Sequence, residues 1–256
     1  MLRHEPSYWS RESARREVYP WQRLATKRCG AVNEKHSKRT CVYCGEGIGT
    51  TRDHIPPKGL FAKPRPRLVT VPCCTQCQAG QSLDDEYFLR MVSMRTGTAD
   101  NASARAARDS ALRSLTKLAK TRFAESLLRA VRESAVYSPA GIYLGQGLIY
   151  DVDLHRLCRV IERTTRGLYF HEFGEALPSN HRCKVYCIDG FDFAGPEVAT
   201  EVQRFWRHAV SGERRDFGEA VFTYWVQRIA GPEDATLWGF LVYGSVAFLA
   251  FTVPKV

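Results

Sequence analysis

The sequence predicts an α+β fold, and three features of the chain predict it. Apolar residues recur at helical spacing between Asp84 and Val131 and again between Leu154 and Leu168. Runs rich in β-branched and aromatic residues follow, and Gly244-Ser245 separates the last two as in an antiparallel hairpin; the runs are 221–229, 237–243 and 246–253. Two Cys-x-x-Cys pairs precede both regions. We expect a small cysteine-rich module, a helical middle and a C-terminal antiparallel sheet with helices.

Composition and charge narrow the class of protein. The chain has 256 residues, 44% of them hydrophobic, and a net charge of +10 at pH 7. An excess of Lys and Arg of this size is typical of a protein that binds nucleic acid, because these side chains displace counterions from phosphates. The first twenty residues are charged and contain no apolar core, so we expect a cytoplasmic protein. The apolar stretch 237–253 is short and rich in β-formers, which favours buried sheet over a membrane span.

The cysteine spacing predicts a structural zinc site. Two thiols separated by two residues bind one metal without backbone strain, and four thiolates complete a tetrahedral zinc site. The expected ligands are the pairs Cys41/Cys44 and Cys74/Cys77, with Cys73 as an extra thiol beside the second pair. His181, Cys183 and Cys187 form a weaker candidate for a second metal site, because no partner pair accompanies them.

The motif between and after these pairs resembles a known family. Residues 53–58 read Asp-His-Ile-Pro-Pro-Lys, residues 71–78 read Val-Pro-Cys-Cys-Thr-Gln-Cys-Gln, and residues 82–87 read Ser-Leu-Asp-Asp-Glu-Tyr. This order resembles the HNH endonucleases, the zinc-stapled branch of the ββα-metal nucleases, and in particular a prokaryotic group with a DHIPPK-type motif. The stretch Gly167–Gly174 also resembles a later part of that group. The resemblance implies a ββα-metal HNH module with a zinc knuckle.

The resemblance also implies a chemistry and a set of site residues. Asp53 corresponds to the first ligand of a catalytic divalent metal, Mg²⁺ or Mn²⁺, and His54 to the general base that deprotonates the attacking water. Gln78 stands at the position of the second metal ligand, where the family has Asn or His. No Asn lies between Cys41 and Arg90, so Thr70 or a backbone carbonyl would have to brace His54. The substrate implied is DNA, in phage defence or restriction, with a homodimer or a partner protein as the assembly.

Two other classes of function remain open beside the nuclease. One is an HNH-like zinc module that binds nucleic acid without cutting it, and the other is a structural component of a larger complex. A proline-spaced basic loop favours contact with nucleic acid, since Lys and Arg neutralise phosphates. Such contact is expected of the nuclease and of the zinc module that does not cut. The candidate DNA-binding residues of the loop are Lys58, Lys63, Arg65 and Arg67.

The chain divides by composition into three regions. Residues 1–38 form a basic arm with a helix expected near 11–18, residues 39–97 form the HNH module, and residues 98–256 form the α+β C-terminal domain. The acids Asp84, Asp85 and Glu86 are expected to stabilise the start of a helix, with Asp85 on the same helix face as Gln78.

Further elements are expected in the C-terminal domain. They are a helix over 102–119 that continues through Val131, a strand over 142–150, a helix capped by Asp151 or Asp153, a strand over 183–188 and a helix over 197–210. In the capped helix, Leu154, Leu157, Cys158, Ile161 and Leu168 are expected on one face, and Arg156, Arg159, Arg163 and Arg166 on the others.

Overall fold

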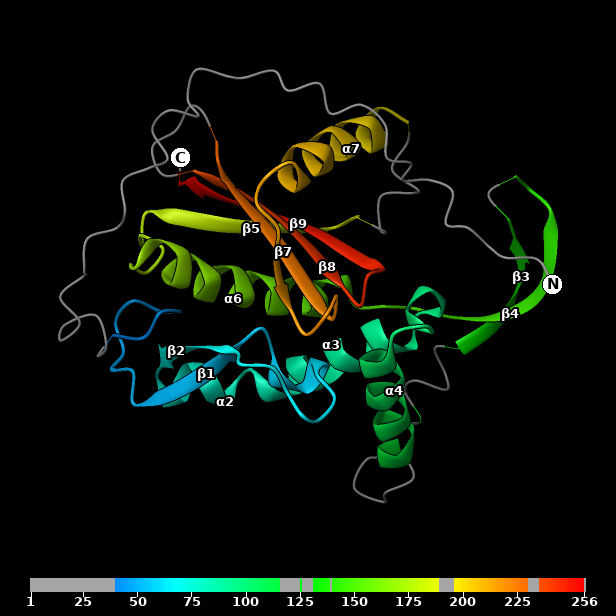
Figure 1. Ribbon diagram of the computed structural model, residues 1–256, viewed down its shortest axis with the longest axis horizontal. Helices are drawn as coiled ribbons and strands as arrows, with labels where there is room; N and C mark the ends of the chain where they lie inside the picture. Colours follow the sequence, from blue (N-terminus) through cyan, green and yellow to red (C-terminus); the bar gives the residue numbers. More distant parts are fainter. Residues whose placement is uncertain are drawn as a thin grey trace. The chain divides into compact units, whose positions relative to one another are not determined.

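The structure is a computed structural model and describes residues 40–115, 125, 131–138, 140–188, 196–229 and 235–255. All of them belong to one compact unit of the chain, Asn33–Val256. The basic arm, the helix expected near residues 11–18 and most of the segment between 116 and 130 lie outside the described residues. The described part is a mixed α+β structure with antiparallel sheets (Figure 1), as the sequence predicts.

The cysteine-rich part contains a two-stranded antiparallel sheet followed by helices. Strand β1 (Thr51–Ile55) pairs with β2 (Val69–Cys73), and His54 lies opposite Thr70 in the register. A long loop with the short 3-10 helix η2 (Lys58–Leu60) connects the two strands. Helix α2 (Thr75–Ala79) begins directly after β2, and α3 (Ser82–Met94) begins three residues after α2 ends. Asp84 and Asp85 therefore lie in the first turn of α3, as expected. Gln78 lies on α2, however, so Asp85 and Gln78 do not share a face of one helix, because the chain breaks the helix between residues 79 and 82.

The middle of the chain differs from the sequence prediction at one point. The 3-10 helix η3 (Thr96–Thr98) leads into α4 (Ala102–Leu115), where the sequence predicts a helix. Val131, however, does not continue that helix, because it begins strand β3 (Val131–Tyr137), which pairs with β4 (Tyr143–Tyr150). The helical spacing of its apolar neighbours misled the prediction, whereas the pairing partner in β4 determines the local structure. Strand β4 itself is confirmed.

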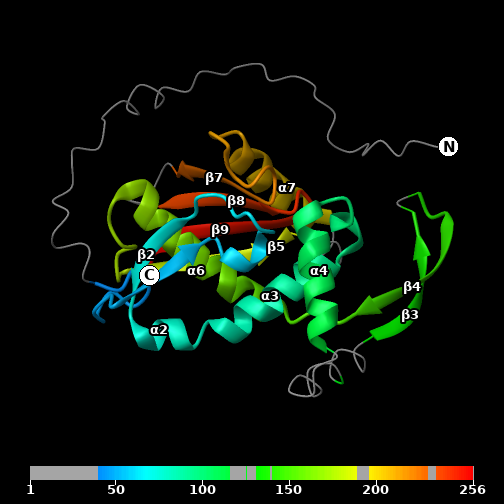
Figure 2. The same ribbon diagram turned by 60° about the horizontal axis from the view of Figure 1, so that its bottom comes forward.

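The C-terminal part is a five-stranded antiparallel sheet with a helix on each face (Figures 1 and 2). Its order is β5-β9-β8-β7-β6, formed by β5 (His181–Cys187), β9 (Val246–Pro254), β8 (Thr236–Val242), β7 (Phe222–Arg228) and β6 (Arg215–Phe217). Helix α6 (Leu154–Phe173) covers one face and α7 (Pro196–Val210) the other. The sequence predicts all of these elements except the three-residue strand β6. No helix among the described residues is long and apolar enough to cross a bilayer.

Helix α6 lies between the sheet and the cysteine-rich part, and its ends follow from local sequence. Asp153 caps the helix because its carboxylate accepts the backbone N–H of Arg156 at 3.2 Å, and Gly174 ends it in the left-handed conformation. Leu157, Ile161 and Leu168 are buried, as the apolar stripe predicts, and Cys158 is half-buried. Leu154 is exposed instead, because it stands in the first turn of the helix, at its end. Together with buried residues of the cysteine-rich part and of the sheet, Leu157, Ile161 and Leu168 form one continuous hydrophobic core.

Close packing fixes α6 against strand β1. A Cβ atom added to Gly167 would lie 2.6 Å from Cγ1 of Ile55, so only glycine allows the helix backbone to approach the strand this closely. Because side chains alternate along a strand, Asp53 shares the α6-facing side of β1 with Ile55, and His54 points to the opposite side. This packing determines the surroundings of Asp53.

Candidate functional site

The four predicted zinc ligands come together in the structure. The sulfur atoms of Cys41, Cys44, Cys74 and Cys77 lie within 4.8 Å of one another, and those of Cys44 and Cys74 are 4.0 Å apart. A tetrahedral zinc with Zn–S bonds of about 2.3 Å needs sulfur atoms roughly 3.8 Å apart, so a small contraction would complete the site. This is the one cluster of metal-ligating side chains found within the described ranges, and His181, Cys183 and Cys187 do not form a second.

The backbone around the thiols suits a metal-bound thiolate cluster. Gly47 donates its N–H to the sulfur of Cys44 at 3.3 Å, and Cys77 donates its N–H to the sulfur of Cys74 at 3.4 Å. A Cβ atom added to Gly47 would lie 3.1 Å from the sulfur of Cys74, so a side chain here would crowd the cluster. Cys74 also caps α2, which places Cys77 one turn later on the same side. The four thiols therefore fit a zinc ion.

The thiols of the cluster have shifted pKa values of opposite direction. Burial raises the pKa of Cys41, but backbone N–H groups of Cys44, Cys74 and Tyr43 outweigh this and lower it to about 6. Burial and the neighbouring thiols raise the pKa of Cys77. One thiol is thus prepared as a thiolate while another resists a second negative charge, and a divalent cation at the centre would relieve that conflict. Cys73 stays apart: it is buried, and its thiol donates to the backbone oxygen of Cys74 at 3.3 Å.

Asp53 is held in a network that the sequence alone does not reveal. Its Oδ2 accepts the hydroxyl of Tyr43 at 2.7 Å, and its Oδ1 accepts the backbone N–H of His54 at 2.9 Å. Arg163 of α6 extends toward the same carboxylate, with Nε 3.4 Å from Oδ2. Tyr43 lies between Cys41 and Cys44, so the cysteine-rich turn directly supports Asp53.

Arg163 also joins Asp53 to Asp85. Its side chain is only 8% exposed, and its Nη2 forms an ion pair and hydrogen bond with Oδ1 of Asp85 on α3. The Nε atom is buried and makes no hydrogen bond with acceptable geometry. Burial alone would lower the pKa of Arg163, but the carboxylates of Asp85 and Asp53 outweigh it. The pKa is therefore raised, and the guanidinium stays charged. Burial, together with the nearby carboxylates of Asp53 and Asp84, leaves the pKa of Asp85 raised although Arg163 lowers it.

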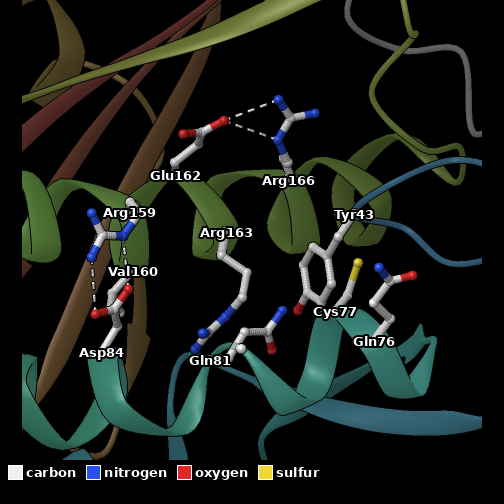
Figure 3. Close-up of a pocket in the computed structure, with 11 residues that line it drawn as sticks. Tyr43, Gln76, Cys77, Gln81, Asp84, Arg159, Val160, Glu162, Arg163 and Arg166 are labelled. Atoms are coloured by element: carbon white, nitrogen blue, oxygen red, sulfur yellow. Dashed lines mark hydrogen bonds and ion pairs between the residues drawn. The ribbon is translucent and has the colours of Figure 1, made fainter.

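Arg159, Arg163 and Arg166 of α6 line an open cleft of about 410 Å³ between this helix and α2–α3 (Figure 3). Arg163 extends from α6 toward Gln81 and Tyr43 in this view. Asp84 accepts from Arg156 and Arg159, each at 2.8 Å, and Arg166 pairs with Glu162 at 3.0 Å. Hydrogen bonding to Arg159 is the main cause of the lowered pKa of Asp84.

Sequence reasoning missed Arg163, although a signal for it is present. Arg156, Arg159, Arg163 and Arg166 recur at intervals of 3, 4 and 3 residues, which places them along one side of a helix. The acidic pair Asp84-Asp85 offers opposite charges at the start of α3. Only the packing of α6 shows that these two sets face each other.

The remaining predicted site residues are exposed to different degrees. His54 is half-buried; opposite it, the hydroxyl of Thr70 accepts from Arg52 at 3.2 Å (Nε) and 2.9 Å (Nη2). Gln78 is exposed on α2 and does not line the cleft. Lys58, Lys63, Arg65 and Arg67 are all exposed on the loop between β1 and β2.

The arrangement around Asp53 fits a divalent metal only in part. Oδ1 of Asp53 accepts one hydrogen bond, from the backbone N–H of His54, whereas Oδ2 contacts both Tyr43 and Arg163. Asp85 is bound to Arg163, and Gln78 is exposed. The pairing of Asp53 with Gln78 as metal ligands therefore stays a prediction.

The chain was compared with protein families, curated proteins and solved structures. No family model, curated protein or solved structure matches this chain.

Proposed function

We propose that the chain is a zinc-stabilised HNH-type endonuclease that hydrolyses phosphodiester bonds in DNA, with His54 as the general base. The observation that carries the proposal is the position of the Asp53-His54 dipeptide. It lies on the first strand of a hairpin that leads directly into a helix, and four clustered thiols link this helix to the turn before the hairpin. In this arrangement, which follows the order of the family motif, the ββα-metal module consists of β1, β2 and α2.

His54 has the chemistry that the first step requires. The neutral form of an imidazole accepts a proton from a water molecule beside it. The His54 side chain is half-buried and points away from α6, where a water and a phosphate can approach. The backbone N–H of His54 is bound by Asp53, whose carboxylate is in turn held by Tyr43 and Arg163. These contacts fix the strand that carries the base.

The basic loop supplies the contact with the DNA backbone. Lys58, Lys63, Arg65 and Arg67 are exposed in the connection between β1, which bears His54, and β2. Cationic side chains beside the base would hold a phosphate near it without reading sequence. A divalent cation bound near Asp53 would add charge at the scissile phosphate.

A second function is favoured by a specific observation. Both oxygens of Asp53 already accept hydrogen bonds, and Gln78 is an exposed residue outside the cleft. In this second function, the module binds nucleic acid through its basic loop and does not cut it.

One assay separates the two functions. Supercoiled plasmid is incubated with the protein and Mg²⁺, Mn²⁺ or Ni²⁺, and nicked and linear products are measured over time. A nuclease cleaves, and His54→Ala lowers the rate by at least about 10²-fold, since a general base contributes roughly 10²–10⁴. His171→Ala is the matched control, because His171 is an exposed histidine at the far end of α6. If the protein binds the plasmid in a gel-shift experiment but produces no nicked or linear product with all three metals, the binding module is favoured.

A further inference from the structure

The hairpin formed by β3 and β4 exposes an unusual amount of apolar surface. Seven large hydrophobic side chains on the two strands and their turn are more than a third exposed: Val136, Tyr137, Ile142, Tyr143, Leu144, Leu148 and Ile149. Together they present several hundred Å² of apolar surface, spread over both faces of the hairpin because neighbouring residues of a strand point to opposite sides. Apolar patches of this size mark interaction surfaces.

The hairpin also lacks the features that keep an exposed strand from pairing. Within the part of the chain that the structure describes, β3 and β4 pair only with each other, so each has a free edge. Strand β4 contains no charged residue and no proline along its whole length, Tyr143–Tyr150. Natural proteins protect exposed edges with such residues, and an isolated two-stranded hairpin is only marginally stable in water. Both facts point to a further strand beside β4.

The sequence of β4 identifies the strand that fits. Residues 144–148 read Leu-Gly-Gln-Gly-Leu, the same in both directions. Two copies of β4 paired antiparallel about Gln146 therefore place Leu144 opposite the partner's Leu148. They also place Tyr143 opposite the partner's Ile149, so apolar side chains meet apolar side chains outward from the centre. A two-fold axis produces this self-complementarity automatically, because the same patch serves both copies.

We propose that the β3–β4 hairpin is a dimerisation arm, and that the β4 edges of two copies of this chain pair antiparallel about Gln146. The product is a four-stranded sheet in the order β3-β4-β4-β3, which exceeds the three strands needed for independent stability. Cross-strand apolar pairs on its faces stabilise the dimer. This inference rests on the hairpin alone and holds whether or not the protein cuts DNA.

The mass of the full chain in solution is the first test. Size-exclusion chromatography with light scattering at micromolar concentration should give twice 29.0 kDa. Leu148→Glu should shift the protein to the single-chain mass, because a charged side chain would replace one apolar partner in both Leu144–Leu148 cross-strand pairs. Leu83→Glu is the matched control, since Leu83 and Leu148 are both 70% exposed, and it should remain a dimer. A single-chain mass for the unmodified protein, or equal dissociation by both variants, would overturn the proposal.

A cross-link tests the register independently of the mass. Directly opposed residues of antiparallel strands have Cα atoms about 4.5–5.5 Å apart, within the about 4.4–6.8 Å that a disulfide spans. Gln146→Cys should therefore form a covalent dimer on mild oxidation, seen on a non-reducing gel against the unmodified chain as background. Glu133→Cys, an exposed position on β3, should stay uncross-linked. A cross-link through residue 133 and none through 146 would reject pairing through β4.

Discussion

Removal of the guanidinium of Arg163 should strongly destabilise the protein. In Arg163→Met the side chain keeps its apolar stem, but Asp53 and Asp85 lose the cation between them. Removing one partner from a buried ion pair costs about 3–5 kcal/mol, because the other charge stays buried without compensation. For a domain of this size that corresponds to a fall of roughly 6–20 °C in Tm. Arg166→Met is the control on the same helix, because its pair with Glu162 is more exposed and removing it should cost about 1 kcal/mol or less.

The destabilisation should depend on pH in a defined direction. Burial already raises the pKa of Asp85, and loss of Arg163 would raise it further. The folded variant then binds more protons than the unfolded chain, so its stability falls as pH rises above about 3.9, the unfolded value, toward the raised folded pKa. Thermal melts of Arg163→Met and of the wild type between pH 5 and pH 8 should therefore diverge most at the upper end.

A second substitution tests whether the uncompensated charge is the cause. Arg163→Met combined with Asp85→Asn removes one of the two partly buried carboxylates and should recover more than about 1 kcal/mol relative to Arg163→Met alone. Urea unfolding of the four combinations measures this coupling. The reasoning fails if Arg163→Met is no less stable than Arg166→Met, or if Asp85→Asn adds its own loss to that of Arg163→Met.

Three further outcomes are expected. Cys44→Ala should lose the bound zinc and lower the Tm, whereas Cys158→Ala, a thiol outside the cluster, should keep one zinc per chain by metal analysis. If Gln78 is a metal ligand, Gln78→Ala should slow plasmid cleavage at least tenfold, about 1.4 kcal/mol, and Gln78→Asn should not have the same effect; equal rates for all three proteins would exclude that role. DNA affinity should fall steeply as salt rises from about 50 to 200 mM, and Arg65→Ala with Arg67→Ala should lower the salt slope by about 2 in a filter-binding assay; an unchanged slope would mean that these side chains do not contact phosphates.

Local sequence patterns predicted most of the elements because their causes are local. The thiol ligands follow from two-residue spacing, the start of α6 from the capping side chain of Asp153, and the last hairpin from Gly244 between two apolar runs. Strand β3 was missed because Val131 also fits a helical repeat, and β6 because three residues carry too little pattern.

The sequence by itself determined which residues can bind zinc and where the Asp-His dipeptide lies along the chain. Only the tertiary structure decided what surrounds that dipeptide. Arg163 lies 110 residues after Asp53 (163 − 53), and the two meet because Gly167 lets α6 pack against Ile55. The cost of burying a charge makes such a contact specific, since Arg163 is stable in the core only where two carboxylates meet it. A linear pattern shows that an arginine lies on a helix, but the partner that allows its burial is a property of the folded chain.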